Sequence, residues 1–272
     1  MKRNNEERTK TRRQQQNAVD PAAVLNFVAP TEFVELPSKG IGYPQGHPLY
    51  DKETIEIRFM TAKDEDILTS KSLLKKGLAV DRLIGNLIID KTIRPEDILI
   101  SDRNAIILAA RSSAYGHIYE TKVQCPSCSS TQKMSFDLSQ GRITEPDFPE
   151  NIQELENGHY MYETEYSKIK VEMRLLTGRD ENIMFKAINS NSDSAMSTQM
   201  KLFVVSVNGH KHPNIIEHFV NNLPAFEARS LRKTFSDLTA MVEVKEDYTC
   251  NSCGYEQEME VPFNADFFWP DR

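Results

Sequence analysis

Apolar and polar residues follow two different periods along this chain, and each period predicts a kind of element. Apolar residues at every second position predict β-strands over residues 54–59, 160–166 and 169–175. Apolar residues at every third or fourth position predict α-helices, one beginning after Thr61 and others over residues 72–90, 101–116, 177–188, 213–220 and 224–238. Residues 200–207 are apolar enough to be buried as either a strand or a helix. The mixture of helices and short antiparallel strands predicts an α+β fold.

Local signals support several of these boundaries. Thr61 can cap a helix N-terminus, and Asp64 at the third helical position suits the positive end of the helix dipole. Gly116 is a natural helix C-cap. Residues 30–50 are rich in glycine and proline, so we expect an extended loop whose apolar residues pack on the body. Residues 139–157, with two prolines and a run of acids, are expected to form a connector.

The four cysteines form two C-x-x-C pairs, Cys125 with Cys128 and Cys250 with Cys253. Each pair lets two thiolates face one ion from a tight turn, and two such turns complete the tetrahedral shell that zinc favours in closed structural sites. We therefore predict one structural zinc ion held by these four residues. Disulfide bonds are the alternative, but a bridge within C-x-x-C is strained and nothing else indicates an oxidising compartment.

The residues around the two cysteine pairs resemble each other. Six positions after the second cysteine of each pair stands a methionine, Met134 and Met259, and an apolar residue follows two positions later in both cases. Each pair is thus expected to be the turn of a β-hairpin, over about residues 117–138 and 241–262. Two hairpins around one metal ion make a zinc ribbon that is discontinuous in sequence.

This arrangement predicts the domain organisation. We expect a disordered basic tail over residues 1–30, an α+β part with the first cysteine turn over 31–138, an inserted α+β lobe over 139–240, and the second turn with an aromatic tail over 241–272. The metal would close a loop of about 120 residues in the unfolded chain, and the entropy of closing so long a loop makes such a clip stabilising.

Composition narrows the function. The chain of 272 residues is 39% hydrophobic and 27% charged, as in soluble globular proteins, and contains no apolar run long enough to span a bilayer. Its polar N-terminal residues lead us to expect no signal peptide. We therefore expect synthesis in a reducing cytoplasm. The net charge is −7, of which residues 1–13 contribute +4 and the remaining residues −11. An acidic body argues against a broad nucleic-acid-binding surface.

No arrangement typical of catalysis is found. A glycine-rich phosphate loop, a nucleophile elbow and an H-E-x-x-H motif are all missing from the sequence. His210, His212 and His218 could be drawn as a second metal site, but no well-spaced carboxylate accompanies them, so we interpret them as surface histidines. We interpret Asp64 and Glu65 as the charged first turn of a helix. The chain is therefore not expected to be an enzyme or to have a small-molecule substrate.

Two groups of residues are candidates for partner contacts. Arg229, Arg232 and Lys233 form a basic stripe on the helix predicted over residues 224–238, where a solvated face is the alternative.

The second group is the run Phe267, Phe268 and Trp269 near the C-terminus. Three successive aromatic side chains cannot all face inward on a strand, because side chains alternate between its two sides. We hypothesise that at least one of them, with Trp269 the leading candidate, contacts a partner. The alternative is that the tail folds back to cover the ribbon.

Several strings of residues resemble a known family. They are Phe59-Met-Thr-Ala-Lys-Asp-Glu-Asp-Ile-Leu-Thr-Ser, Leu74-Lys-Lys-Gly, and the ending Cys250-Asn-Ser-Cys-Gly-Tyr-Glu-Gln-Glu-Met-Glu-Val-Pro-Phe-Asn-Ala-Asp-Phe-Phe-Trp-Pro. Over roughly residues 33–270 the chain is similar to the baseplate hub proteins of T4-type contractile-tailed bacteriophages. The resemblance implies a tail protein made in the host cytoplasm that forms or helps to assemble the central hub of the baseplate. Its implied partners are other tail and hub proteins.

The competing class is a zinc-ribbon protein that binds nucleic acid or assists transcription. The second predicted hairpin carries Glu256, Glu258 and Glu260, whereas phosphate binding requires lysine and arginine. These acidic residues count against the competing class.

Overall fold

The structure is a computed structural model of the whole chain, which divides into two compact units, Met1–Pro30 and Thr31–Arg272. It describes residues 29–149, 151–189, 195–261 and 265–268. Residues 1–28 of the predicted disordered basic tail lie outside the described ranges, so its disorder stays a prediction. The subdivision of the second unit into three parts stays a prediction.

Within the second unit, the described residues form both helices and short strands. The α-helices are α3 (Ala62–Thr69), α4 (Lys71–Lys76), α5 (Ala79–Leu87), α6 (Ile100–Tyr115), α7 (Gly178–Asn189), α8 (Ala195–Phe203), α9 (Pro213–Asn222) and α10 (Ala225–Asp237). Short 3-10 turns are η1 (Pro95–Asp97), η2 (Leu138–Gln140) and η3 (Ala265–Phe268).

The strands pair only in the antiparallel sense among the described residues. The strands are β1 (Thr31–Glu35), β2 (Thr54–Arg58), β3 (Ile118–Gln124), β4 (Thr131–Asp137), β5 (Arg142–Thr144), β6 (Ile152–Glu154), β7 (Tyr160–Glu163), β8 (Lys170–Met173), β9 (Val204–Val207), β10 (Met241–Glu243), β11 (Lys245–Thr249) and β12 (Glu256–Glu260). They form one four-stranded sheet, β6-β7-β8-β9, and four pairs, β1-β2, β3-β4, β5-β10 and β11-β12. The predicted α+β fold is thereby confirmed.

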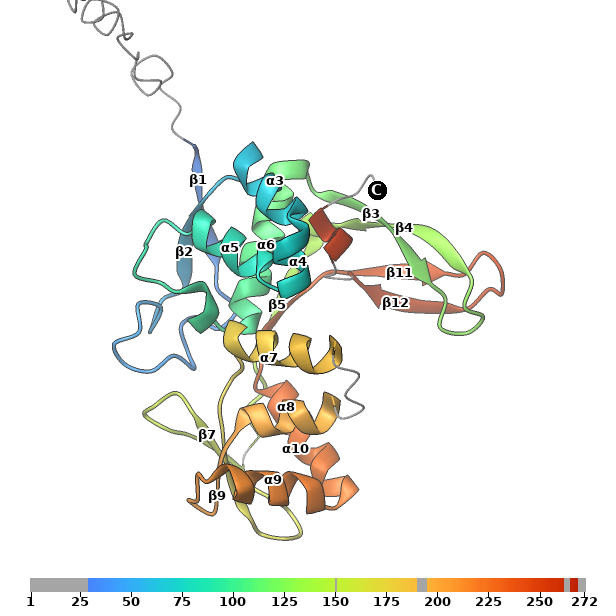
Figure 1. The fold of residues 1–272 in the computed structure, drawn as a ribbon. Helices are drawn as coiled ribbons and strands as arrows, with labels where there is room; N and C mark the ends of the chain where they lie inside the picture. Colours follow the sequence, from blue (N-terminus) through green and yellow to red (C-terminus); the bar gives the residue numbers. More distant parts are fainter. Residues whose placement is uncertain (1–28, 150, 190–194, 262–264, 269–272) are drawn as a thin grey trace, which may run out of the picture. The chain divides into compact units, whose positions relative to one another are not determined.

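Figure 1 shows how these elements group in the second unit. Helices α3 to α6 lie together beside the β1-β2 pair, and the hairpins β3-β4 and β11-β12 lie side by side. Helices α8 and α9 pack on each other and on β9 of the four-stranded sheet. No helix in the described ranges is both long enough and apolar enough to span a membrane.

The helix predicted over residues 72–90 is in fact two helices, and the reason is Gly77. This residue has φ of 69°, the left-handed conformation that ends α4, and its N–H bonds back to the carbonyl oxygen of Leu74. A Cβ at this position would lie 2.7 Å from the Phe185 ring, so a side chain here would also force that ring to move. The helical prediction failed because glycine conformation outweighed the apolar periodicity.

Two further stretches differ from expectation because of their strand partners. Residues 200–207 are both helix and strand, since α8 ends at Phe203 and β9 continues directly to pair with β8. The expected connector contains β5 and β6, which pair with β10 and β7. Both added strands have only three residues, too few to give a period of their own.

The loop before β2 packs on the body as predicted. Leu36, Tyr43 and Leu49 are all buried. The Tyr43 hydroxyl donates to the buried carboxylate of Asp102 at 2.8 Å, and Ser38 donates to the same carboxylate from both its hydroxyl and its N–H. Burial raises the pKa of Asp102, while these hydrogen bonds act in the opposite direction.

One strand-to-helix junction occurs twice in the chain. In the first copy, the two Nη atoms of Arg58 contact the two carboxylate oxygens of Asp64 at 2.7 and 2.9 Å, and Asp64 also accepts the N–H and hydroxyl of Thr61. In the second copy the same bonds recur at 2.7 to 3.0 Å. The residues that correspond are Arg58 with Arg174, Thr61 with Thr177, and Asp64 with Asp180.

The repeat extends beyond the junction. At the same offset in the sequence, Ala79–Leu87 (α5) corresponds to Ala195–Phe203 (α8), and Ile88 corresponds to Val204. Ile88 bridges to β2 as Val204 pairs with β8. Each copy ends in a hairpin with a C-x-x-C turn. The sequence carries this signal, because R-x-x-T-x-x-D occurs in both halves, but sequence reasoning recognised only the cysteine turns as copies.

A buried arginine joins the two copies. The Arg103 side chain of α6 is 2% exposed and contacts Asp81 of α5 at 2.7 Å and Glu181 of α7 at 3.1 Å. It also donates to the carbonyl oxygen of Pro95 at 2.7 Å. Because α5 and α7 belong to different copies, this network holds the copies together.

Candidate metal centre

The four cysteines meet at the turns of the two hairpins. Their sulfur atoms all lie within 4.8 Å of one another, a group that could hold a metal ion. The Sγ atoms of Cys125 and Cys253 are 3.7 Å apart, as are those of Cys128 and Cys250. These separations exceed an S–S bond of about 2.05 Å, so the cysteines are not paired as disulfides.

The two turns have the same backbone geometry. The N–H of Cys125 bonds to the carbonyl oxygen of Ser130 at 2.8 Å, and the N–H of Cys250 bonds to that of Tyr255 at 2.8 Å. The residue after the second cysteine has positive φ in both turns, 59° at Ser129 and 71° at Gly254. The prediction of two equivalent hairpin turns agrees with this geometry.

Gln132 of β4 ties the first hairpin to the second turn. Its side-chain amide donates to the carbonyl oxygen of Thr249 at 2.9 Å, and its carbonyl oxygen accepts the N–H of Asn251 at 2.9 Å. These two bonds hold the turns in register. The sequence analysis did not single out Gln132, because the partners of this half-buried side chain are set only when the hairpins meet.

Hydrogen bonds at the centre favour thiolate at some of the cysteines. The Ser130 hydroxyl lies 3.0 Å from the sulfur of Cys128 and 3.3 Å from that of Cys250. The Ser130 hydroxyl, helped by backbone N–H groups, lowers the pKa of Cys250 to about 5 against the effect of burial. It also lowers the pKa of Cys128. Such bonds stabilise the charged form, which is the form that binds metal.

The pKa of the Cys253 thiol indicates that the four cysteines together favour a bound cation. The N–H of Tyr255 acts to lower the pKa of Cys253, but burial and the three neighbouring sulfurs raise it to about 11. Four adjacent thiols cannot all ionise by themselves because their negative charges repel one another. A bound cation removes this restriction.

A buried hydroxyl beside the sulfurs fits the same interpretation. The Tyr248 hydroxyl is buried and has no hydrogen-bond partner among the described residues. Burial raises the pKa of Tyr248, and the adjacent sulfurs of Cys250 and Cys125 add to the effect. A neutral hydroxyl at this place can donate to a metal-bound thiolate, a common second contact around metal ligands.

The predicted basic stripe on α10 is not a continuous free surface. Lys233 pairs with Asp237 at 2.6 Å, and Arg232 is half-buried, with one Nη atom 3.6 Å from the sulfur of Met200. Arg229 is exposed. Their role in partner binding stays a prediction.

Two of the three C-terminal aromatics are buried in the body of the chain. Phe267 is 1% and Phe268 is 4% exposed, and the ring of Phe267 meets that of Tyr119 edge-on at 5.0 Å. The carbonyl oxygen of Phe267 accepts a hydrogen bond from Arg111 at 3.0 Å. The tail thus folds back as far as Phe268, whereas Trp269 lies outside the described residues.

The histidines do not gather with the cysteines. Nδ1 of His212 accepts the N–H of Asn214 and so caps α9. His159, which sequence reasoning left aside, lies 2.8 Å from the buried carboxylate of Glu172, and Ser206 donates to the same carboxylate at 2.8 Å. The carboxylate stands between hydroxyl and imidazole, so this is not the order of a catalytic triad, in which the imidazole is central.

Comparison with known proteins agrees with the resemblance seen in the sequence. A family model described as T4 bacteriophage base plate protein matches residues 31–269. No curated protein and no solved structure matches the chain. The matched range begins with β1 and includes both cysteine turns. The chain therefore belongs to the T4 bacteriophage base plate protein family.

Proposed function

We propose that the cysteine centre binds one zinc ion with a structural role. Zinc–sulfur bonds of about 2.3 Å in a tetrahedron place the sulfurs roughly 3.8 Å apart. The two sulfur pairs at 3.7 Å fit this spacing. The ligands would be Cys125, Cys128, Cys250 and Cys253, which leave no open coordination position. A site of this kind fastens the hairpins together and has no place for a substrate.

We further propose that the protein is a non-enzymatic component of the central hub of a phage baseplate, structural or acting in its assembly. The family match over residues 31–269 carries this proposal, and the resemblance of several strings to hub proteins supports the finer assignment to the hub. The partners would be other tail and hub proteins. The protein would be made in the host cytoplasm and act where the baseplate is built.

The nucleic-acid-binding alternative is less well supported. Glu256, Glu258 and Glu260 are exposed on β12 next to the second cysteine turn. In a nucleic-acid-binding ribbon, this strand would face phosphates that its carboxylates repel. Filter binding at low and moderate salt would distinguish the two classes.

Deletion of the gene tests the proposed function. Because a missing hub component should stop baseplate assembly, lysates of the deletion phage should lack complete tails in electron micrographs. Expression of the gene from a plasmid should restore them, which is the control for effects on neighbouring genes. Complete, contractile tails on the deletion particles would refute the proposal.

We propose that Trp269 contacts a neighbouring tail protein. A protein that stops after Phe268 keeps both buried phenylalanines, so its metal content and melting temperature should match those of the full chain. Its co-purification with neighbouring tail proteins should be lost. The control is Phe267→Ala, which removes a core ring and should lower the free energy of unfolding by about 3–5 kcal/mol. Loss of stability or metal in the truncated protein would instead assign Trp269 to the core.

A further inference from the structure

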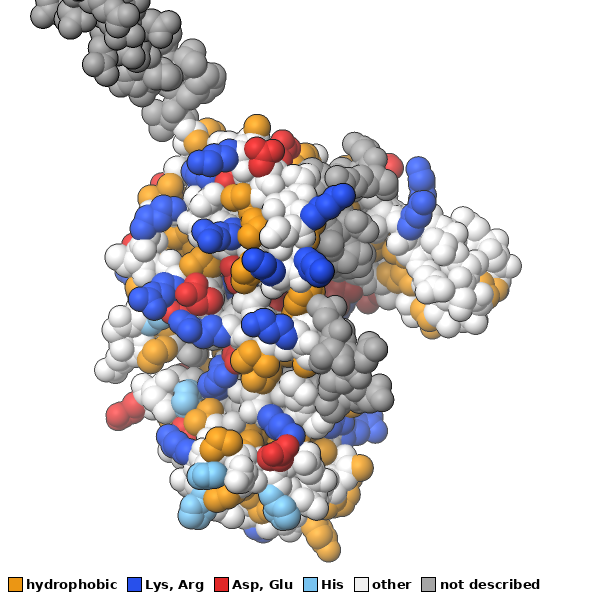
Figure 2. Space-filling model, in the orientation of Figure 1, with side chains coloured by type: hydrophobic (Ala, Val, Ile, Leu, Met, Phe, Trp, Pro, Cys, Tyr) orange, Lys and Arg blue, Asp and Glu red, His pale blue; other side chains and the backbone are white. Residues whose placement is uncertain are grey.

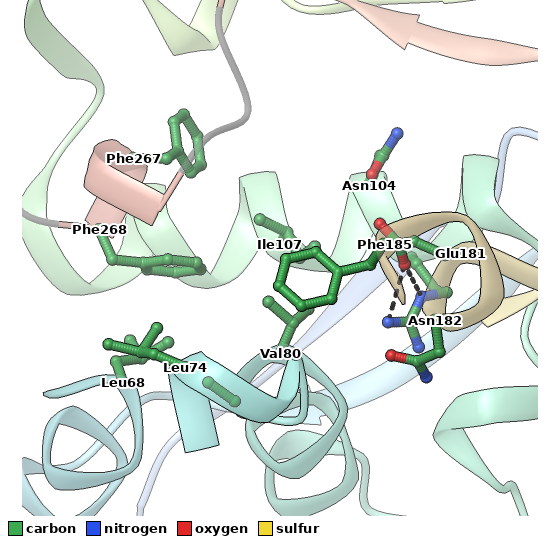
Figure 3. A pocket seen from close by; sticks show the side chains of 13 residues that line it. Leu68, Leu74, Val80, Asn104, Ile107, Glu181, Asn182, Phe185, Phe267 and Phe268 are labelled. Atoms are coloured by element: carbon green, nitrogen blue, oxygen red, sulfur yellow. Dashed lines mark hydrogen bonds and ion pairs between the residues drawn. The ribbon is translucent and has the colours of Figure 1, made fainter. Parts of the chain in front are cut away.

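A pocket of about 370 Å³ opens between α4, α6, α7 and η3. Most of its wall is apolar, and Figure 3 shows the side chains that face it. They include Leu68, Leu74, Val80, Ile107, Phe185 and Phe268. Arg103 and Glu181 both line the pocket and contact each other at 3.1 Å. The volume is sufficient for a large apolar side chain.

Helix α4 at the pocket edge has little support from the rest of the chain. None of its six residues is buried. Leu74 is 37% exposed, and Phe185 on the facing helix α7 is 38% exposed. A six-residue helix is marginal by itself and normally depends on packing of an apolar face. The apolar residues of α4 are therefore only partly covered by the rest of the described chain.

The internal repeat provides a comparison for α4. At the offset that relates the two copies, residues 73–78 correspond to residues 189–194. The first stretch is Leu-Leu-Lys-Lys-Gly-Leu, and the second is Asn-Ser-Asn-Ser-Asp-Ser. The junctions and the helices α5 and α8 around these stretches nevertheless correspond. The leucines and lysines of α4 are therefore specific to the first copy and do not belong to the repeated pattern.

The rim of the pocket is positively charged on a chain whose net charge is −7. Lys71, Lys75 and Lys76 on α4 and Lys186 on α7 are exposed. None of the four lies in an ion pair within the described part of the chain, unlike Lys39, whose partner is Glu145. Figure 2 shows Lys and Arg side chains around apolar ones over α4 and α7, with few acidic side chains between them.

We propose that α4 and this pocket bind an acidic segment of another baseplate protein, which inserts a large apolar side chain between Leu74 and Phe185. This docking proposal rests on the proposed function and identifies the surface through which the protein would contact its partner. A buried apolar anchor with complementary charges at the rim is the usual arrangement of a protein interface. The positive charge of the pocket rim favours an acidic occupant over a basic one such as the segment 1–13 of this chain.

Photo-crosslinking in infected cells can identify the occupant. Ser72 is exposed and lies one turn before Lys75 and Lys76, so the photoreactive amino acid benzoylphenylalanine at this position would report on the same face of α4. After irradiation, mass spectrometry should find crosslinks to an acidic segment of another tail protein that contains an aromatic or aliphatic residue. Crosslinks to a basic segment, to a second copy, or to residues 269–272 of the same chain would overturn the proposal.

Charge reversal tests the contribution of the lysines. Lys75→Glu/Lys76→Glu should reduce the crosslink yield at least about tenfold, because repulsion replaces attraction at the rim. The control is Lys122→Glu/Lys133→Glu, the same change of charge at two exposed lysines that face each other across β3 and β4. Both variants should keep the melting temperature and metal content of the parent.

The two proposals fail in different ways. If gene deletion abolishes tails but Lys75→Glu/Lys76→Glu phage form normal tails and normal crosslinks, the hub function stands and the docking surface is overturned. If the deletion phage form complete tails, the hub function itself fails.

Discussion

Replacing Cys250 by serine is expected to remove the metal ion and much of the stability of the protein. The serine hydroxyl is a poor replacement for a thiolate, and the three remaining sulfurs cannot complete the tetrahedral shell. Without the ion, the unfolded chain regains the freedom of a loop of about 120 residues, and the folded hairpins lose the charge that offsets their thiolates. We expect the zinc content to fall below half an equivalent and the melting temperature to fall on the order of 10 °C.

Metal analysis and calorimetry on protein purified without added metal provide the measurement. The matched control is Ser252→Ala, which changes the same turn without removing a sulfur, and it should keep one zinc ion per chain. A parent protein with less than half an equivalent of zinc would contradict the proposed site. So would a Cys250→Ser protein that keeps its metal and melting temperature.

Removing the arginine of either repeated junction is expected to destabilise the protein severely. Asp64 is 0% and Asp180 3% exposed, and each carboxylate has an arginine as its charged partner. Arg58→Ala or Arg174→Ala leaves a buried carboxylate without its counter-charge, which costs about 3–5 kcal/mol. Since a typical domain is stable by only about 5–15 kcal/mol, the double variant should be largely unfolded. Urea unfolding followed by circular dichroism measures these changes.

Arg179→Ala is the control for the junction variants. The Arg179 side chain is 55% exposed and pairs with Asp97 at 2.6 Å on the surface. An exposed pair contributes about 0–1 kcal/mol, so this variant should unfold nearly as the parent does. A loss as small for Arg58→Ala as for Arg179→Ala would show that the junctions do not support the fold.

The same junction predicts how stability depends on pH. Burial acts to raise the pKa of Asp64, but the hydrogen bonds of Arg58 and Thr61 outweigh it and lower the pKa from 3.8 to about 2. The unfolded state therefore binds this proton more readily than the folded state. The difference contributes about 2 kcal/mol of stability above pH 4, which is lost as the pH falls toward 2. Arg58→Ala should remove most of this contribution.

The sequence was informative wherever the determining interactions are local. Each C-x-x-C turn is closed by bonds within six residues, so spacing alone predicts its geometry. The cap at Thr61 and the end of α6 at Gly116 depend on single residues and their nearest neighbours. The strings that resemble baseplate proteins also lie within short segments. These features allowed the fold class, the clustering of the four cysteines and the family to be predicted before the structure.

Asp64 shows where local reasoning was incomplete. The sequence correctly placed its carboxylate in the first turn of a helix, but it did not predict that the carboxylate is buried. The structure buries it against Arg58, and the copy at Asp180 is buried in the same way. An acidic residue in the first turn of a helix has the same local sequence whether it is exposed or buried in an ion pair. Its burial is therefore decided by the packing of the surrounding elements.

Only the tertiary structure decided which distant segments meet. The three-residue strands β5 and β6 form because they pair with β10 and β7. Three residues are too few for an apolar pattern to predict such a strand. Arg103 and Gln132 bind partners from other parts of the chain, and the pocket beside α4 needs residues from α7 and η3. Hydrogen bonds within a turn are fixed by the sequence that makes the turn. Contacts between remote segments depend on the packing of the whole unit.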